Sequence, residues 1–344
     1  MNIILDAHGG DNAPLEVIKG AAMAVREYGV QVTLCGRQDD ILAAAEQSGI
    51  PLANLEGIKI APAAQAMPMD VDPTDIVGNY ANSSMAVGLK LLAEGRGDAF
   101  VTAGNTGAVV VGASLFVKRL KGIKRAAIAT LIPTMERPYL LIDSGANAEC
   151  RPEMLQQFAI MGSAYMSKVL GVENPRVGLV NIGTEENKGT SLQLEAFKLL
   201  QASPINFIGN VEAREIPLGG VDVAVCDGFT GNVILKLTEG MGKLMSSELK
   251  KILLKNTGTK LAALMVKGGV DNFRKKMDYT EHGGAPLLGI SKPVIKAHGS
   301  SNDKAFKNAI RQAKQMVENQ MIATIAEGLA SLKAQEGEQK NTDE

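Results

Sequence analysis

The segment Ala99–Val117, AFVTAGNTGAVVVGASLFV, contains the pattern on which the fold prediction rests. It begins with a short apolar run, continues through the turn-forming residues Gly104–Gly107, and ends in a second apolar stretch. Its nineteen uncharged residues are enough to span a membrane, but Gly and Asn in the middle favour a buried strand, a loop and a helix. We therefore predict a strand–loop–helix unit here and no membrane-spanning segment.

The same unit recurs along the chain. Short apolar runs bounded by Gly, Asp or Asn alternate with segments of helical periodicity, which indicates βαβ units and a mainly parallel sheet. Helices are predicted at residues 15–28, 39–47, 85–93, 153–170 and 191–200. The predicted fold is α/β, a Rossmann-like, mainly parallel sheet with flanking helices. We expect one large domain over residues 1–335 and a frayed polar tail at 336–344.

The composition excludes several classes of protein. With 45% hydrophobic and 21% charged residues, the chain resembles ordinary globular proteins rather than disordered ones. Its 36 Lys and Arg balance 37 Asp and Glu, and a general nucleic-acid-binding protein would carry a basic excess, so we expect no nucleic-acid partner. Three widely spaced cysteines and the absence of a basic, apolar leader favour the cytoplasm.

One segment breaks the alternation of strands and helices. Residues 243–276 carry nine Lys or Arg and only two acidic residues. The sequence predicts a protruding helical hairpin with breaks at 256–258 and 268–269, and we interpret residues 243–280 as a basic amphipathic helical insertion.

The insertion contains six consecutive apolar residues, Leu261–Val266, between Lys260 and Lys267. Two interpretations remain open. The hairpin packs on the body or in a dimer interface, or it contacts an acidic partner or an anionic membrane. The candidate contact residues are Lys260, Leu261, Leu264 and Lys267.

Five predicted strands end in polar, glycine-rich loops: DAHGGDNAP, TAGNTGA, DSGAN, NIGTEENKGT and CDGFTGN. Open α/β sheets bind ligands beyond the carboxyl ends of their strands, and free backbone N–H groups at a helix start favour an anion. One such loop is weak evidence because turns need Gly anyway, but five indicate a site for a phosphate-like ligand. The candidate binding residues in these loops are Gly104, Asn105, Thr106, Gly107, Asn181 and Asp227, and the candidate catalytic residues are Lys188 and Asn232.

A second dense cluster is GGAPLLGISKPVIKAHGSSNDKAFKNAI, residues 283–310. The sequence predicts an irregular Gly- and Pro-containing segment, a short strand, and a helix from Asp303 capped by Ser301 or Asn302. Three further candidates then lie near this helix start. His298 is a candidate catalytic residue, and Ser300 and Lys304 are candidate substrate-binding residues.

Several common cofactor and nucleophile motifs are absent. The chain has no G-x-G-x-x-G after its first strand, no P-loop, no G-x-S-x-G and no metal-ligand spacing among its three histidines. We therefore expect neither a cofactor nor a bound metal.

Six motifs occurring in order from Ile3 to about Ile310 resemble the bacterial phosphate acyltransferases of phospholipid synthesis, the PlsX family. They are DAHGGDNAP, TAGNTGA, DSGANAECRPEMLQQFAIMG, LVNIGTEENKG, CDGFTGNVILKLTEG and residues 283–310. The chain departs from the family pattern at His8, where Met is usual, and at Ser144, where Val is more frequent.

The resemblance implies a fold similar to phosphotransacetylases and isopropylmalate dehydrogenases. It also implies transfer of a long-chain acyl group from acyl carrier protein to inorganic phosphate, giving acyl phosphate for phosphatidic acid synthesis. The implied partners are acyl carrier protein, phosphate, a second copy in a homodimer, an anionic membrane surface and a downstream membrane acyltransferase. The implied location is cytoplasmic and peripheral to the membrane.

On this basis, we assign roles to the candidate residues as hypotheses. The Gly104–Gly107 backbone and Lys188 would bind phosphate, and Asn232 and His298 would stabilise the oxyanion or place the thioester. Asp227 would orient Lys188 or His298.

Two alternative functions remain. An isopropylmalate-dehydrogenase-like oxidoreductase would share the fold, but it needs an Arg-rich pocket that these loops do not contain. A non-catalytic scaffold would recruit lipid enzymes through residues 243–276, but it has no need for polar loops at five strand ends.

Overall fold

The computed structural model describes residues 1–51, 56–134, 137–277 and 283–342. The strands are β1 Asn2–Asp6, β2 Gln31–Gly36, β3 Ile58–Pro62, β4 Ala99–Thr102, β5 Ala127–Ile132, β6 Tyr139–Ile142, β7 Val177–Asn181, β8 Phe207–Glu212, β9 Val223–Val225, β10 Ala285–Leu288 and β11 Val294–Lys296. The α-helices are α1 Leu15–Tyr28, α2 Gln38–Gln47, α3 Ser84–Ala93, α4 Thr106–Gly112, α5 Pro152–Leu170, α6 Ser191–Gln201, α7 Gly228–Leu253, α8 Thr257–Met277, α9 Asp303–Glu318 and α10 Met321–Thr342. Short helical turns are η2 Pro73–Val77, η3 Ala113–Val117 and η4 Ile216–Leu218.

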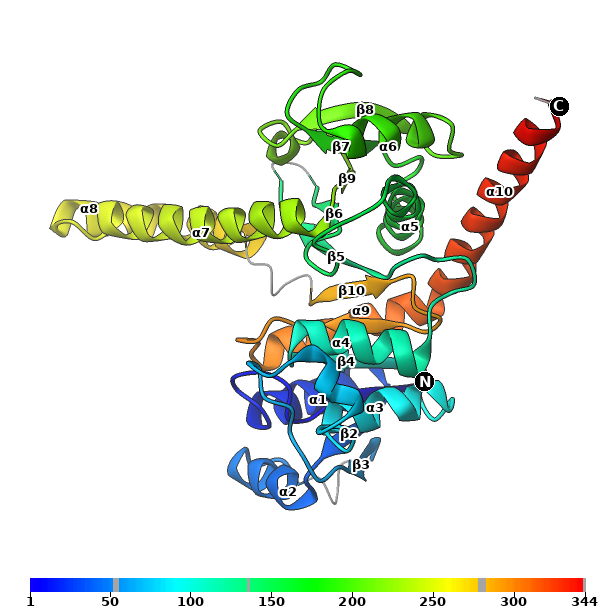
Figure 1. The fold of residues 1–344 in the computed structure, drawn as a ribbon. Coiled ribbons are helices and arrows are strands. Elements are labelled where there is room, and N and C mark those ends of the chain that lie inside the picture. Colours follow the sequence, from blue (N-terminus) through cyan, green and yellow to red (C-terminus); the bar gives the residue numbers. More distant parts are fainter. Residues whose placement is uncertain (52–55, 135–136, 278–282, 343–344) are drawn as a thin grey trace.

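The strands form one eleven-stranded sheet in the order β3-β2-β1-β4-β11-β10-β5-β6-β9-β7-β8, and helices flank it (Figure 1). The neighbouring pairs are parallel except where β10 meets β11 and β5, and where β5 meets β6. The predicted mainly parallel α/β fold is therefore confirmed. The predicted single domain over residues 1–335 stays a prediction.

Two strands differ from the sequence-based expectation. The segment before residue 290 was expected to be irregular, but Ala285–Leu288 forms β10 in the middle of the sheet. The Gly and Pro residues in and around this segment are unfavourable for a strand, so the sequence did not predict one. The strand is stabilised by long-range pairing with β5 and β11. β3 was not predicted and forms one sheet edge with partly exposed residues.

The strand–loop–helix unit at Ala99–Val117 has the predicted form. β4 is buried throughout, and Asn105 caps α4 by accepting a hydrogen bond from the Ala108 N–H at 3.0 Å. This unit places its loop at the carboxyl end of β4.

On the other side of the sheet, α1 packs closely on α9 because Gly20 has no side chain. A Cβ on Gly20 would lie 2.6 Å from the Phe306 Cβ.

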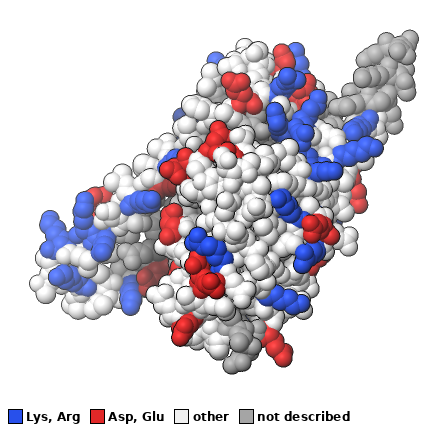
Figure 2. All heavy atoms as spheres, turned by 60° about the horizontal axis from the view of Figure 1, so that its bottom comes forward, with Lys and Arg blue, Asp and Glu red and all other residues white. Residues whose placement is uncertain are grey.

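α7 and α8 form the predicted hairpin, and they leave the body side by side (Figure 1). We call this pair of helices the basic hairpin, and Figure 2 shows blue Lys and Arg side chains gathered on it. The expected break near 256–258 is confirmed by the gap between the helices, but α8 continues through 268–269. The prediction of a second break was wrong, because each glycine inside a helix destabilises it by only about 1 kcal/mol. Residues 278–280 of the expected insertion lie outside the described residues.

The C-terminal helix α10 continues as far as Thr342, so it includes most of the segment 336–344 that we expected to fray, and residues 343–344 lie outside the described part. Across the described ranges, none of the helices has the length and apolar character needed to cross a membrane.

Candidate functional site

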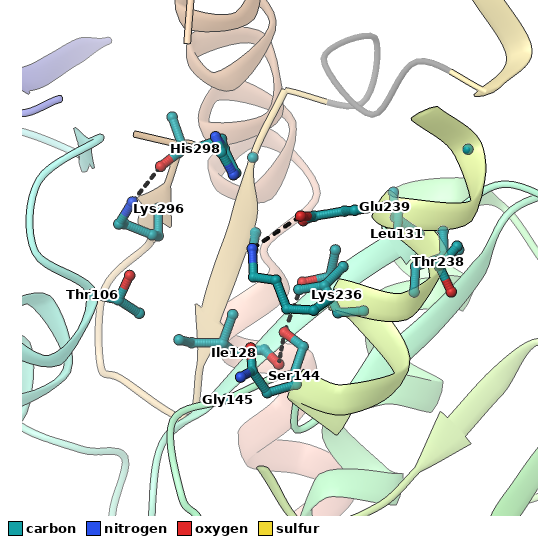
Figure 3. A pocket seen from close by; sticks show the side chains of 18 of the residues that line it. Thr106, Ile128, Leu131, Ser144, Gly145, Lys236, Thr238, Glu239, Lys296 and His298 are labelled. Carbon is teal, nitrogen blue, oxygen red and sulfur yellow. Dashed lines mark hydrogen bonds and ion pairs between the residues drawn. The ribbon is translucent and has the colours of Figure 1, made fainter. Parts of the chain in front are cut away.

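A cavity of about 950 Å³ opens where the carboxyl ends of the central strands meet the start of α7 (Figure 3). The loops after β4, β6, β9 and β11 contribute to its wall, as expected for a ligand site in an α/β sheet. The polar side chains that line it include Thr106, Ser144, Asn232, Lys236, Glu239, Lys296, His298 and Ser301.

Lys296, the last residue of β11, is a buried cation at this wall, with 9% of its surface exposed. Its ammonium donates hydrogen bonds to the carbonyls of Ala103 (3.2 Å) and Ala297. An ammonium has three N–H donors, so these two described acceptors leave one for a ligand. Burial lowers the pKa of Lys296 to about 8, although Asp6 and Asp11 oppose the shift. The group is therefore a cation at neutral pH, placed to attract an anion.

His298 lies beside Lys296, two residues after the end of β11 (Figure 3). The Ser300 N–H donates to its Nδ1 at 3.2 Å, and the Ser300 hydroxyl lies 2.8 Å from the same atom. Because Nδ1 accepts a backbone hydrogen bond, the neutral ring carries its proton on Nε2. Burial lowers the pKa of His298, which favours this neutral form. The residue is thus a hydrogen-bond donor that needs no ionisation to act.

Ser301 supplies an unsatisfied hydroxyl. It lines the cavity with 2% of its surface exposed, and its Oγ has no hydrogen-bond partner within the described residues. A buried hydroxyl without a partner costs free energy, about 1–3 kcal/mol in proteins. The Ser301 Oγ is itself closed to solvent, so the residue adds an unpaired polar group to the wall next to Lys296 and His298.

The loop after β6 is held by a fully buried carboxylate, Asp143. Its oxygens accept hydrogen bonds of 2.7–3.1 Å from the N–H groups of Ile128, Gly145, Ala146 and Asn147, and from the Asn147 amide. These contacts fix the loop that presents Ser144 and Gly145 to the cavity. Asp143 is a positioning residue of the wall.

The opposite part of the cavity is apolar. Leu131, Ile132 and Pro133 at the end of β5 face Leu235 on α7. Figure 3 shows Leu131 and Thr238 on one side of the cavity and Lys296 and His298 on the other. The wall can therefore hold an anion at one end and hydrocarbon at the other.

Lys236 and Glu239 on α7 lie between these two ends (Figure 3). Their side chains form an ion pair of 3.0 Å, and 55% of the Lys236 side chain is exposed. Because its carboxylate partner already compensates the charge, Lys236 is a weaker anion anchor than the buried Lys296.

Several predicted site residues meet at this cavity. Thr106, Asn232 and His298 line it, and Ser300 supports His298. Asn232 lies against Gly145, whose added Cβ would be 3.6 Å from the Asn232 Oδ1. These side chains come from three separate segments: the start of α4, the first turns of α7 and the loop after β11.

Other predicted residues have structural partners instead. The Asn105 amide donates to the carbonyls of Met69 and Val71, and Asp227 caps α7 through Thr230. The backbone N–H of Lys304 donates to Asp303, and Lys304 is not part of the cavity lining. Gly104 and Gly107 also lie outside the lining, next to Thr106.

Lys188 and Asn181 lie on the loop after β7, which does not contribute to the cavity lining. Asn181 donates to the Lys188 carbonyl at 3.0 Å. The Lys188 ammonium lies 4.0 Å from Glu185, and 45% of its side chain is exposed. Neither side chain lines the cavity, and the roles assigned to Asn181 and Lys188 stay predictions.

The four hairpin candidates lie on α8, beyond Lys250, the last residue of α7 that lines the cavity. Leu261 is 66% exposed and Leu264 is 69% exposed, which is unusual for large apolar side chains. They leave an apolar surface flanked by Lys260 and Lys267.

Sequence reasoning missed Lys296, Ser301, Lys236 and Ser144 as cavity residues. A usable signal existed for Lys296. It follows Val294 and Ile295 in a strand that is buried throughout, and a buried lysine is costly unless a counter-charge or ligand compensates it. Within the described ranges, no group of three or more His, Cys, Asp or Glu is placed to hold a metal ion.

Known proteins match this chain over most of its length. The family model described as "Fatty acid synthesis protein" matches residues 1–324. The phosphate acyltransferase of Alkaliphilus oremlandii is 49% identical over 332 residues, which are 96% of this chain and 98% of that protein. The phosphate acyltransferase of Thermoanaerobacterium thermosaccharolyticum is 46% identical over 325 residues, 94% of this chain and 96% of that protein.

A solved structure supports the fold. A phosphotransacetylase from Streptococcus pyogenes matches with a TM-score of 0.66 and 17% identity, covering 92% of this chain and 94% of its own. The match agrees with the fold similarity that the sequence motifs implied. The match of the family model and the near-complete coverage at 46–49% identity confirm the resemblance to the phosphate acyltransferases. The chain therefore belongs to the phosphate acyltransferase family of fatty acid and phospholipid synthesis.

Proposed function

We propose that the protein transfers a long-chain acyl group from acyl carrier protein to inorganic phosphate, giving acyl phosphate. The observation that carries the proposal is one cavity that joins a buried cation, Lys296, to an apolar wall. Phosphate matches the end formed by Lys296, His298 and Ser301, and an acyl chain matches the end formed by Leu131 and Leu235. Membership of the phosphate acyltransferase family supports a site that binds phosphate together with an acyl group.

The chemistry needs no covalent enzyme intermediate. A phosphate oxygen bonds to the thioester carbonyl carbon, and the carbonyl π electrons move to oxygen. When the tetrahedral adduct collapses, the C–S bond breaks and the carrier leaves as thiolate, which takes up the proton that phosphate carried. In this proposal Lys296 holds phosphate, and the His298 Nε2–H and the Asn232 amide, which belong to residues of the cavity lining, stabilise the oxyanion.

The proposed carrier contact is the basic hairpin. Lys and Arg side chains gather on it (Figure 2), and acyl carrier protein is acidic. Complementary charge accelerates encounter and orients the partner. A homodimer, peripheral membrane contact and delivery to a membrane acyltransferase in the cytoplasm complete the proposal.

The donor class is tested with purified protein and two thioesters, palmitoyl-acyl carrier protein and palmitoyl-coenzyme A, each with and without phosphate. We expect phosphate-dependent thiol release that is faster from the carrier protein. Thiol release that ignores phosphate would identify a thioesterase instead. Reduction of NAD by a 2-hydroxyacid would support the oxidoreductase alternative, and catalysis of neither reaction would support the scaffold.

Lys296→Met should raise the KM for phosphate roughly 10- to 100-fold, because a charge-assisted contact contributes about 1.5–3 kcal/mol. The pH profile gives a second signature. Lys296 is charged below a pKa of about 8 and neutral above it, so the wild-type KM for phosphate should rise as pH increases beyond 8. The Met variant should lack this rise. Initial rates at varied phosphate between pH 7 and pH 9.5 measure both effects.

Lys188→Ala is the matched comparison, because Lys188 is a lysine outside the cavity lining. Equal KM values for phosphate in wild type and Lys296→Met would remove Lys296 from the phosphate site. If Lys188→Ala alone raised the KM, phosphate would bind at the loop after β7, as the motifs first indicated.

Replacing Leu261 and Leu264 by Glu should release the protein from anionic vesicles and leave turnover of palmitoyl-coenzyme A near normal, because that donor has no carrier protein to dock on the basic hairpin. Each basic residue near an anionic surface contributes about 1 kcal/mol, and each fully buried leucine about 1.5–3 kcal/mol. Binding should therefore be reversible and weakened by salt. Flotation with vesicles containing phosphatidylglycerol measures it.

Leu218→Glu is the control, since Leu218 is 61% exposed on the body rather than on the basic hairpin. It should leave flotation unchanged. A wild-type protein that never floats would reject membrane contact. If the double variant became monomeric on size exclusion, these leucines would belong to a dimer interface.

A further inference from the structure

The cavity continues along one face of α7, away from the strand ends. Asn232, Leu235, Glu239, Gly242 and Ser246 line it at intervals of three or four residues, which places them on the same side of the helix. Each helical residue rises about 1.5 Å, so Gly242 lies about 15 Å beyond Asn232 along the axis. The groove that starts at the phosphate end therefore reaches and passes Gly242.

Gly242 leaves open space in the wall. A Cβ built on it meets no described atom within 4 Å, and the residue lines the cavity. A larger side chain here would enter the groove without displacing a neighbour. Gly240, two residues earlier, also has open space around its Cβ, but it is exposed and does not line the cavity.

We propose that Gly242 sets the longest acyl chain that the enzyme accepts, because the chain of a bound thioester runs along α7 past this residue. The inference rests on the proposed function. With C–C bonds of about 1.5 Å and angles near 111°, an extended chain advances about 1.25 Å per carbon, so octanoyl reaches about 10 Å and palmitoyl about 20 Å. Measured from Asn232, octanoyl stops short of Gly242 and palmitoyl passes it.

The apolar wall supports this path. Leu131, Ile132 and Leu235 line the cavity, and Leu235 lies between Asn232 and Gly242 on α7. Hydrocarbon removed from water against such side chains is stabilised in proportion to its buried area. A longer acyl chain therefore gains from the groove as far as the wall remains open.

The test compares Gly242→Leu with wild type, using palmitoyl- and octanoyl-acyl carrier protein. We expect Gly242→Leu to lose at least about tenfold in kcat/KM with palmitoyl and to stay near wild type with octanoyl, since pocket overfilling by one side chain discriminates on this scale. Gly240→Leu is the matched control and should keep the wild-type ratio. Circular dichroism checks that both variants are folded.

Direct binding of a fluorescent palmitate analogue is a second measurement, which does not require turnover. Wild type and Gly240→Leu should bind the analogue, and Gly242→Leu should bind it at least about tenfold more weakly. If wild type binds the analogue but forms no acyl phosphate, the proposed function fails while the groove remains. The inference is overturned if Gly242→Leu keeps the palmitoyl preference, or if it loses both donors equally.

Discussion

His298→Ala is expected to lower kcat about 10²- to 10³-fold while changing the affinity for acyl carrier protein little. Loss of one preorganised oxyanion donor has an effect of this size in acyl transfer. The reason lies in the ring geometry. Nδ1 accepts the Ser300 N–H at 3.2 Å, so the proton on Nε2 is held ready for a developing negative charge. A contact that strengthens only in the transition state affects kcat rather than binding. Steady-state kinetics measure kcat, and a separate titration measures the affinity for acyl carrier protein.

His298→Gln is the informative companion variant, because its amide retains an N–H donor without an ionisable ring. Partial recovery of kcat is expected for a donor role. His298 would instead be structural if both variants kept the wild-type rate and only melted at lower temperature.

Asp143→Ala is expected to destabilise the protein by about 3–5 kcal/mol. The substitution removes the acceptor of three backbone N–H groups and one side-chain amide in the β6 loop and of the Ile128 N–H in β5, and each buried unsatisfied group costs about 1–3 kcal/mol. The sum is reduced because the loop can shift and admit water. Urea unfolding followed by circular dichroism gives the free energy of unfolding.

Asp72→Ala is the control for this prediction. Asp72 also accepts a backbone hydrogen bond, from Thr74 at 2.8 Å, but at the exposed start of η2. Water replaces the lost acceptor there, so its effect should be much smaller. Equal stability of Asp143→Ala and wild type would mean that the β6 loop does not depend on the carboxylate.

The helices were the most predictable part of the fold. The amphipathic periodicity of Leu15–Tyr28 predicted both ends of α1, and Gly29 ends the helix with a positive φ of 63° that glycine adopts without strain. β10 could not be predicted in the same way. Its Ala285–Leu288 residues include Pro286 and follow two glycines, so their strand character comes from partners more than 150 residues away on β5.

The site was predictable as a place but not residue by residue. Three of the five polar strand-end loops, those after β4, β6 and β9, line the cavity, because parallel strands present their carboxyl ends at one edge. Asn105 and Asp227 were chosen as ligands, yet each caps a helix, and capping favours the same residue types as anion binding. Which lysine faces the cavity depends on tertiary packing, so the motifs indicated the loop residue Lys188 and not the buried Lys296, which lines the cavity.

The central claim is that phosphate itself attacks the thioester in this cavity. Its most direct test mixes the purified protein with palmitoyl-acyl carrier protein and radiolabelled phosphate, then measures label in an organic extract alongside free carrier thiol. The account predicts labelled palmitoyl phosphate in amounts equal to the thiol released, with formation slowed in His298→Ala. Thiol release without labelled acyl phosphate, or no reaction with properly folded protein, would contradict it.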